Sequence, residues 1–260
     1  MSTKMIQGKL WSIAPRYWSK YFEPWFLPVY RNVLEQLKLE KGDLLLDAGC
    51  GSGLFSHMAI KSGAEVTGVD AAPGLLELAR ERNPGFNFLE EDLEALPFAN
   101  DSFDIVTGFN SFQYAGSFEH ALLEAKRVLK PGGRLVLVIW DKPEKSDGTE
   151  VLKVIGSLLP PPPPGTPGPF ALSEDGKIEA VFEKNGLKLA YRKSIACPFI
   201  YFNRQDAVKS YLGTGPAAAA MNSHEKRVVE EVISNAVGRF HLTEDMYFMQ
   251  NRFLVFIAEK

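Results

Sequence analysis

Between residues 42 and 140 the chain alternates short apolar runs with longer segments of mixed composition. Short apolar runs bounded by glycine, proline or acidic residues are typical of buried strands, and the longer segments are typical of helices. The expected strands are 43–47, 65–69, 86–90, 104–108 and 134–140, and the expected helices are 54–62, 73–82 and 118–129. This alternation predicts a parallel sheet that is covered by helices on both faces.

The N-terminal flank is rich in aromatic residues. Pro15, Pro24 and Pro28 divide it into short helical pieces, because proline removes a backbone donor and clashes with the preceding turn. We expect this segment to cover an apolar surface; an ordinary core-packing helix pair and a membrane-surface anchor are the alternatives. Eight of the chain's 30 aromatic residues lie here: Trp11, Tyr17, Trp18, Tyr21, Phe22, Trp25, Phe26 and Tyr30.

The C-terminal flank also differs from the core. Five consecutive prolines, Pro160–Pro164, enforce an extended polyproline II conformation, which favours a stiff connection or lid edge over an SH3 or WW ligand. Apolar residues recur at helical spacing between residues 228 and 237. The expected elements are helices at 173–185, 203–212 and 223–240 and strands at 187–195 and 253–258.

Composition narrows the class of protein. With 260 residues, of which 45% are hydrophobic, the chain is long enough for one large core with an added cap. A net charge of -3 provides no general attraction to nucleic acid, so no nucleic-acid partner is expected. The chain lacks an apolar run of signal-peptide or membrane-spanning length, which predicts a cytoplasmic protein without stable membrane insertion.

Cysteine and histidine usage adds two expectations. Cys50 and Cys197 are the two cysteines and lie far apart in the sequence, so a structural disulfide is not expected. No cysteine or histidine pair has the spacing of zinc ligands, so no metal site is expected.

The most informative motif follows the first expected strand. An apolar run ends at Asp47, and Gly49, Gly51 and Gly53 follow at every second position. Glycine permits a sharp turn and lets a ligand approach the backbone amides, and the next helix directs its N-terminus toward that ligand. We therefore predict a nucleotide-binding loop. Because position 54 is Leu, the loop departs from the G-x-G-x-x-G pattern of dinucleotide-binding proteins, and Asp47 would repel phosphates but attract an ammonium or sulfonium group.

Further polar residues stand at the ends of the other expected strands. Asp70 ends the second strand, Asp92 follows the third, and Asn110 follows the fourth. Ligands in parallel sheets bind beyond the carboxyl ends of the strands, so these side chains should meet at one edge. A Pro131-Gly132-Gly133 turn then leads into the last strand of the series.

These segments, in this order over residues 44–140, resemble the class I S-adenosylmethionine-dependent methyltransferases, in particular the small-molecule group similar to ubiquinone and menaquinone biosynthesis methyltransferases. The resemblance implies an α/β, Rossmann-like, doubly wound sheet of seven strands. The sheet would be mostly parallel, with a reversed last strand between the fifth and sixth, helices on both faces and a helical substrate cap. It also implies a single domain with an aromatic cover (1–40), a cofactor-binding core (41–140) and cap insertions with the final strands (141–260).

The resemblance further implies S-adenosyl-L-methionine as the cofactor and S-adenosyl-L-homocysteine as the product. Asp70 would take both ribose hydroxyls, Asp92 the adenine amino group, and the amide of the next residue a ring nitrogen. Tyr17 and Tyr21 are alternative hydroxyl donors to the cofactor carboxylate. The expected cofactor-binding residues are Asp47, Gly49, Cys50, Gly51, Gly53, Asp70, Ala71, Asp92, Leu93, Phe109 and Asn110.

The expected reaction is an in-line displacement that transfers a methyl group to a small, apolar or aromatic molecule. A non-catalytic S-adenosylmethionine-binding module is the first alternative, and an NAD(P)-dependent oxidoreductase is the second. His57, His120 and His241 are candidate bases, but none is assigned a catalytic role. Five aromatics of the C-terminal part are available to line an acceptor pocket or to pack in a core: Phe170, Phe199, Tyr201, Phe202 and Tyr211.

Overall fold

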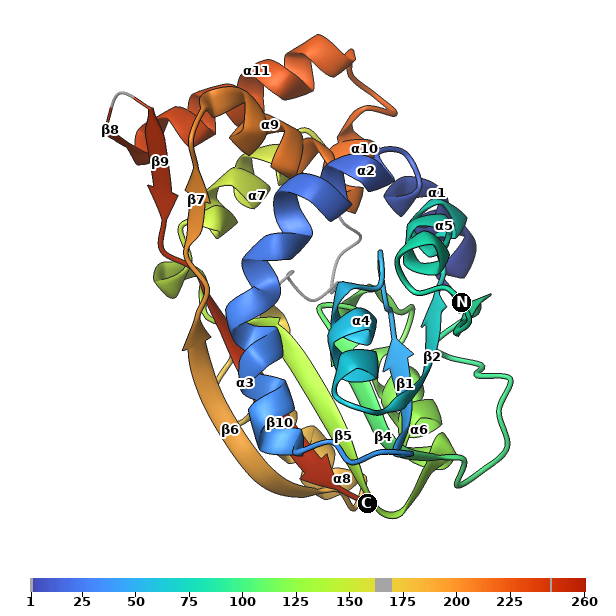
Figure 1. Ribbon diagram of the computed structural model, residues 1–260. Coiled ribbons are helices and arrows are strands. Elements are labelled where there is room, and N and C mark those ends of the chain that lie inside the picture. The colour runs from blue at the N-terminus through green and yellow to red at the C-terminus, as the bar shows by residue number, and fades with distance from the viewer. Residues whose placement is uncertain (1, 162–169, 244) are drawn as a thin grey trace.

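A seven-stranded sheet forms the centre of the computed structural model, which describes residues 2–161, 170–243 and 245–260 (Figure 1). Its strands, in sheet order, are β3 (Asn87–Glu90), β2 (Glu65–Asp70), β1 (Leu44–Ala48), β4 (Phe103–Phe109), β5 (Leu129–Trp140), β10 (Arg252–Glu259) and β6 (Lys188–Ala196). The strands from β3 to β5 are parallel to one another, and β10 is antiparallel to both of its neighbours. The predicted fold class is confirmed, including the reversed last strand between the fifth and sixth.

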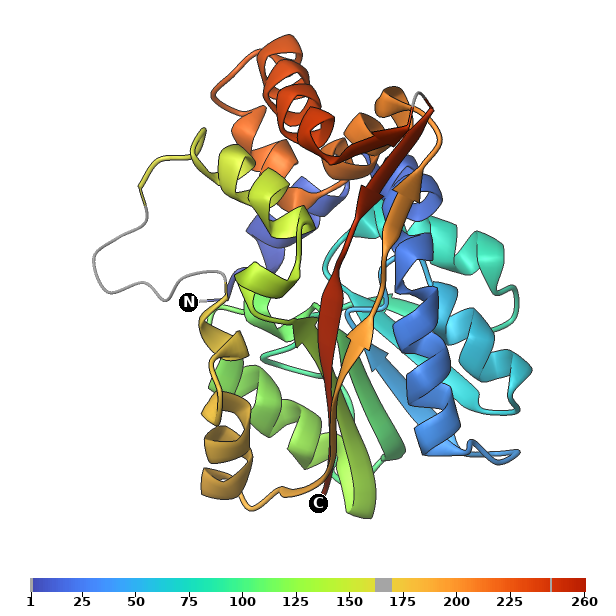
Figure 2. The same ribbon diagram turned by 90° about the vertical axis from the view of Figure 1, so that its left-hand side faces the viewer.

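Helices cover both faces of the sheet (Figure 2). Side chains alternate between the two faces of the sheet along β5, and both faces are buried. This explains why the strands appear in the sequence as continuous apolar runs. Val136 and Val138 pack with the helices of one face, whereas Leu135 and Leu137 pack with those of the other. On the first face lie α3 (Leu27–Leu37), α4 (Leu54–Lys61) and α5 (Pro73–Arg82), and on the second lie α6 (Phe118–Val128) and α8 (Lys177–Lys184).

The N-terminal segment runs over the sheet as a series of short helices that lead into α3 (Figure 1). Pro15, Pro24 and Pro28 each occupy the first or second position of one piece, where the missing N–H costs little. This agrees with the predicted division into short pieces. The pieces before α3 are α1 (Lys4–Trp11), α2 (Pro15–Tyr17), the π-helical turn η1 (Trp18–Phe22) and the 3-10 turn η2 (Glu23–Phe26).

A cap lies beyond the carboxyl ends of β1, β2 and β4 (Figure 1). Its helices are α7 (Gly148–Gly156), α9 (Arg204–Leu212), α10 (Gly215–Ala220) and α11 (Lys226–Val237). A second sheet stands beside them, with the strand order β7 (Phe199–Tyr201), β9 (Met246–Met249) and β8 (His241–Thr243). The sequence pattern predicted α9 and α11 but missed α7, α10 and the small sheet, because strands of three or four residues are too short to show an alternating pattern.

Other differences from the expected elements have local causes. Gly176 adopts a left-handed conformation, with φ of 78°, so the helix expected at 173–185 divides into the 3-10 turn η5 (Ala171–Ser173) and α8. The expected Pro-Gly-Gly turn lies within β5, where Gly132 donates its N–H to the Lys260 carbonyl. Three further 3-10 turns are η3 (Phe112–Tyr114), η4 (Pro143–Lys145) and η6 (Gly238–Phe240). The proline run is described only as far as residue 161, so the polyproline conformation expected there lies largely outside the described residues.

None of the helices in the described ranges combines the length and the apolar character needed to cross a bilayer.

Phe253 of β10 joins the central sheet to the N-terminal cover. Its ring centroid lies 4.7 Å from that of Phe26 and 4.5 Å from that of Trp140, and its side chain is fully buried. Phe253→Ala should lower the free energy of unfolding by roughly 3 to 5 kcal/mol, because it removes a buried ring and leaves a cavity. Urea denaturation measures this change.

Phe202→Ala is the matched control, because that ring is 69% exposed and should contribute less than about 0.5 kcal/mol. Equal losses in the two variants would contradict this account of the core.

Candidate functional site

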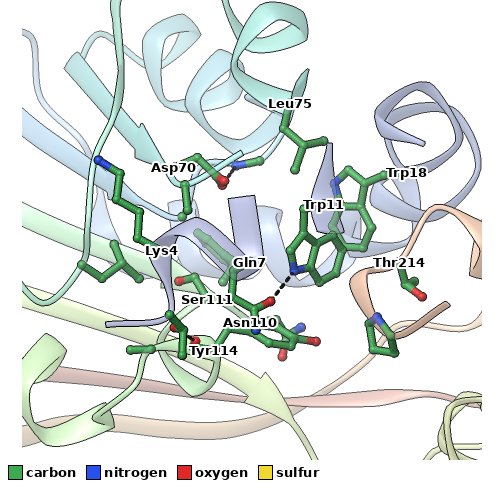
Figure 3. A pocket seen from close by; sticks show the side chains of 18 of the residues that line it. Lys4, Gln7, Trp11, Trp18, Asp70, Leu75, Asn110, Ser111, Tyr114 and Thr214 are labelled. Carbon is green, nitrogen blue, oxygen red and sulfur yellow. Dashed lines mark hydrogen bonds between the residues drawn. The ribbon is translucent and has the colours of Figure 1, made fainter. Parts of the chain in front are cut away.

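A cavity of about 950 Å³, a volume that includes space open to solvent, lies at the carboxyl ends of β1, β2 and β4 (Figure 3). Its position is the one in which open parallel sheets bind ligands. Eight of the eleven expected site residues line it: Gly49, Gly51, Asp70, Ala71, Asp92, Leu93, Phe109 and Asn110.

The glycine loop forms the floor of the cavity and lies against the loop after β4. A Cβ on Gly49 would lie 2.1 Å from the Cβ of Ser111, so no larger residue fits without moving a loop. The Ser111 hydroxyl donates to the Ala48 carbonyl at 2.6 Å, which fixes this close approach. The N–H of Gly51 donates to Oδ2 of Asp70 at 2.9 Å. The loops after three strands are therefore held in one arrangement.

Three expected residues do not line the cavity. The Cys50 side chain packs with Leu76, Ala79 and Phe88, and burial raises the pKa of its thiol well above the usual range. Gly53 begins α4, where a Cβ would collide with Asn83 and Ala79 of the α5 region. The structure thus gives both residues packing roles, and their contact with a cofactor stays a prediction.

Asp47 is the third of these residues, and its carboxylate is buried beneath the loop. Oδ2 accepts a hydrogen bond from Ser56 at 2.6 Å, and Oδ1 accepts one from Thr107 at 3.0 Å. Burial raises the pKa of Asp47 to about 6, although the two hydroxyl donors lower it. The carboxylate therefore braces β1 against α4 and β4, and its predicted attraction of a cationic group stays a prediction.

The carboxylates of Asp70 and Asp92 stand at one end of the cavity. Besides Gly51, Asp70 accepts the N–H of Ala72 at 2.9 Å; burial raises its pKa, and these backbone donors oppose the change. Asp92 accepts hydrogen bonds from the N–H of Glu94 and from the Ser2 hydroxyl. Each carboxylate keeps free lone pairs for further donors.

The N-terminal residues close over this acidic end. Thr3 donates to the Tyr114 carbonyl, and Lys4 donates to the Glu90 carbonyl at 2.9 Å and lies 3.8 Å from the Glu91 carboxylate. Figure 3 shows Lys4 and Asp70 on one side of the cavity and Trp11, Trp18 and Thr214 on the other. The charge of Lys4 is thus directed to the acidic end.

Aromatic and aliphatic side chains form the opposite end of the cavity. Trp11, Trp18, Phe22 and Phe26 come from the N-terminal segment, and Trp140 from the end of β5. Three residues of the cap complete it: Leu152, Thr214 and Pro216. The expectation that the N-terminal segment covers an apolar surface agrees with this arrangement.

The five aromatics that were available from the C-terminal part do not line the cavity. Phe199, Tyr201 and Tyr211 are buried in the core between the cap and the N-terminal segment. Phe202 is exposed, and Phe170 packs against the edge of the core. The sequence left open whether these aromatics line a pocket or pack in a core. The structure supports packing for Phe170, Phe199, Tyr201 and Tyr211, and neither role for Phe202.

Asn110 follows β4 in a left-handed conformation, with φ of 50°, which is uncommon for residues other than glycine. Such backbone strain clusters at ligand sites. Its Oδ1 accepts a hydrogen bond from Nε2 of Gln113 at 3.1 Å, while its Nδ2 is buried without a partner. Asn110 therefore presents an unused polar atom at the wall of the cavity.

The candidate bases lie outside the cavity. His57 pairs with Asn83, His120 is exposed beside Glu94, and His241 lies on the surface with its ring tilted against that of Tyr247. Tyr114 does line the cavity, but burial raises its pKa to about 12, so it is a neutral phenol near pH 7. In the described residues, no three potential metal ligands gather into a metal-binding group.

A buried ion pair attaches the N-terminal segment to the glycine loop. Oε2 of Glu23, a residue that is 2% exposed, accepts a hydrogen bond from Arg82 at 2.8 Å and another from the Ser52 hydroxyl. Burial raises the pKa of Glu23, and the Arg82 charge opposes this effect. Arg82 also donates to the Ser52 carbonyl and to the Ser19 hydroxyl.

Sequence reasoning missed most of the N-terminal and cap contributions. One signal was present: Trp18, Phe22 and Phe26 stand four residues apart, a spacing that places side chains on one helix face. The lining residues not predicted individually are Thr3, Lys4, Gln7, Trp11, Trp18, Phe22, Phe26, Leu75, Glu91, Ser111, Tyr114, Ala115, Trp140, Leu152, Thr214 and Pro216.

Comparison with known proteins agrees with this geometry. Residues 46–137 match the family model described as a methyltransferase domain. This match confirms the resemblance drawn from the sequence and, with it, S-adenosylmethionine as the cofactor expected for such a domain.

Two of the curated relatives illustrate the similarity. The malonyl-[acyl-carrier protein] O-methyltransferase of Erwinia pyrifoliae is 42% identical over 129 residues, which cover 50% of this chain and 49% of that protein. The demethylmenaquinone methyltransferase of Thermus thermophilus is 41% identical over 123 residues, which cover 45% of this chain and 56% of that protein. The matches thus span about half the length of these relatives.

The solved structure of an S-adenosylmethionine-dependent methyltransferase from Aquifex aeolicus superposes with a TM-score of 0.53 and 19% identity. The match covers 70% of this chain and 92% of that protein, and at this identity it concerns the fold alone.

The buried Asp47 carboxylate should make stability depend on pH. Its pKa rises from 3.8 to about 6 on folding, so the folded state holds the proton more strongly and the free energy of unfolding falls as pH rises through this window. A pKa difference of this size corresponds to roughly 3 kcal/mol. Asp47→Asn should reduce that fall, to which Glu23 and Asp70 also contribute because burial raises their pKa values. Urea denaturation at several pH values between 4 and 7 measures the change, and parallel profiles for the two proteins would contradict it.

Asp70→Asn should weaken the binding of S-adenosylhomocysteine by roughly 10-fold or more, because it removes the negative charge and one of the two oxygens. These oxygens accept the N–H groups of Gly51 and Ala72 and are predicted to accept the ribose hydroxyls. Calorimetry gives the dissociation constant. Asp104→Asn serves as the control, since that carboxylate pairs with Lys130 away from the cavity. If both variants bound like the original protein, Asp70 would be removed from the site.

Proposed function

We propose that this chain, whose residues 46–137 carry a methyltransferase domain, transfers a methyl group from S-adenosylmethionine to a small, uncharged, ring-containing acceptor. In this proposal the chain is a single domain in which 1–40 covers the site, 41–140 binds the cofactor and 141–260 supplies the cap and the final strands. The acceptor is a small molecule rather than a nucleic acid.

The proposal rests on the uneven distribution of polar and apolar residues in the cavity. Asp70 and Asp92 stand at one end, the glycine loop lies in the middle, and Trp18, Phe22 and Trp140 form part of the other end. A ligand that binds along the whole cavity therefore needs hydroxyl and amino groups at one end and apolar surface at the other. An adenosyl cofactor meeting an apolar acceptor has this character.

The residues present fit the cofactor. Asp70 has lone pairs available for two ribose hydroxyls, Asp92 can accept from the adenine amino group, and the Leu93 amide stands beside it. The loop at Gly49 has no room for a Cβ, so the backbone itself forms the cavity floor. When bound, the cofactor supplies a sulfonium methyl whose carbon–sulfur bond breaks as the acceptor's nucleophile attacks.

The aromatic end restricts the acceptor's charge. Lys4 is the one lysine or arginine among the described lining residues, and it is directed to Glu90 and Glu91 at the other end. A carboxylate buried among Trp18, Phe22 and Trp140 would lack a counter-charge and incur a desolvation cost. An uncharged ring avoids this cost and stacks on the aromatic walls.

The protein contributes positioning rather than proton transfer. No histidine lines the described cavity, and the Tyr114 phenol stays protonated near neutral pH. Holding two reactants in an attack geometry can supply roughly 7 to 11 kcal/mol of the barrier, and the aromatic walls exclude water from that geometry. The acceptor's nucleophile is therefore one that needs no base from the protein, such as an activated ring carbon or an amine.

The decisive experiment has two stages. Calorimetry with S-adenosylmethionine, S-adenosylhomocysteine, NADH and NADPH identifies the cofactor, and binding of a nicotinamide alone would overturn the proposal. Formation of S-adenosylhomocysteine is then followed with hydroxylated ring compounds, quinol-type rings, aromatic amines and a malonyl thioester as acceptors. Turnover with the rings supports the proposal; preference for the malonyl thioester overturns the acceptor class, and binding without turnover favours a non-catalytic module.

Leu152→Trp should block the acceptor end, because residue 152 lines it from α7 and a larger side chain would fill the space. We expect the KM for the acceptor to rise by about 10-fold or more, with the affinity for S-adenosylhomocysteine unchanged. Lys153→Trp adds the same ring at an exposed position of the same helix and should change neither value. Steady-state kinetics and calorimetry on the three proteins measure both quantities.

A further inference from the structure

Trp18 carries a buried hydrogen-bond donor that nothing in the protein satisfies. Its side chain lines the cavity, and its indole Nε1 is shielded from solvent without a hydrogen-bond partner. An indole can donate through this nitrogen but cannot accept. A buried N–H left unpaired is costly, so this atom is suited to a ligand that brings an acceptor.

The indole lies where the glycine loop meets the aromatic end. Nε1 is 3.4 Å from the point at which a Cβ of Gly51 would stand, and Gly51 has φ of 55°. The donor therefore lies beside the glycine loop, at the residue whose N–H is bound by Asp70. Figure 3 shows Trp18 beside Trp11 on the side of the cavity opposite Lys4.

Packing holds the indole in this orientation. The Trp18 ring stacks on Phe22 at a centroid distance of 4.9 Å and meets the edge of Trp11 at 5.0 Å. Gly213, at the end of α9, leaves no room for a Cβ against the Trp18 backbone, since the distance to its nitrogen would be 2.4 Å. The N–H is thus presented in one direction before any ligand arrives.

We propose that the Trp18 indole N–H donates a hydrogen bond to the carboxylate of the cofactor's methionine part. This inference rests on the proposed function, because it takes S-adenosylmethionine as the ligand. The carboxylate is the one anionic group of that cofactor. The acids Asp70, Asp47 and Glu23 lie around the glycine loop at Cys50, so a carboxylate bound beside that loop needs a hydrogen-bond donor.

The other candidate donors fit less well. Tyr17 and Tyr21, the alternatives from the sequence, do not line the cavity; their rings contact each other at 6.0 Å, and Lys20 and Lys209 lie over Tyr21. Asn110 also has an unpaired buried nitrogen, but its amide can present either nitrogen or oxygen to the cavity. Trp18 can present a donor alone.

The test removes one group from each partner. Trp18→Phe keeps a ring for stacking on Phe22 but lacks the N–H. S-Adenosylhomocysteine and its decarboxylated analogue, S-adenosyl-3-thiopropylamine, differ by the carboxylate. Calorimetry should show the variant binding S-adenosylhomocysteine roughly 10- to 100-fold more weakly, as expected for a lost hydrogen bond to a charged group. Its affinity for the analogue should stay within about twofold.

Trp11→Phe is the matched control, because Trp11 also lines the cavity but its indole N–H already donates to Gln7 at 3.2 Å. It should leave the ratio of the two affinities unchanged. Equal weakening of both ligands by Trp18→Phe would mean that Trp18 acts by packing, and no weakening would mean that it makes no such bond; either result overturns the inference alone. If neither ligand bound the original protein, the proposed function would fail with it.

Discussion

The buried carboxylate of Glu23 is the interaction on which the arrangement of the site depends. It lies in the N-terminal segment, yet its partners Arg82 and Ser52 belong to the end of α5 and to the glycine loop. Removing one member of a buried ion pair leaves an uncompensated charge, which is strongly destabilising. Trp18 and Phe22 lie in the turn η1, which immediately precedes Glu23, so their position is tied to the position of the loop. The wall formed by Trp18 and Phe22 and the floor formed by the glycine loop are therefore fixed relative to each other.

The central sheet could be predicted from the sequence because its strands are buried on both faces. Leu45 and Leu46, or Val136 and Leu137, face opposite layers, so each strand appears as a continuous apolar run whatever its neighbours are. The small sheet could not be predicted in this way. β7 has three residues, and its pairing with β9, more than forty residues later, is a tertiary contact with no local pattern.

The candidate site was predictable where function depends on the backbone. Gly49 follows β1 directly and Asp70 is the last residue of β2, so their placement at the sheet edge comes from the alternation of elements alone. Asp47 shows the limit of that reasoning: its partners Ser56 and Thr107 come from α4 and β4, and these hydroxyls turn the carboxylate into a brace. The apolar end was less predictable, because Trp140, Leu152 and Thr214 come from three elements whose meeting is set by tertiary packing.

The two ends of the cavity are closed by different kinds of contact, so the contacts at the two ends should open at different rates. The acidic end is closed by residues 2–6 through exposed polar contacts such as those of Ser2 and Lys4, each worth about 0 to 1 kcal/mol, and Met5 and Ile6 project into solvent. The later part of α1 is packed instead, with Gly8 against Ala71 and Trp11 against Trp18. The apolar end is closed by buried rings such as Phe22 and Phe26. Segments with few buried contacts open more often than the core does. Local opening is therefore expected first at residues 2–6, while the aromatic end stays assembled.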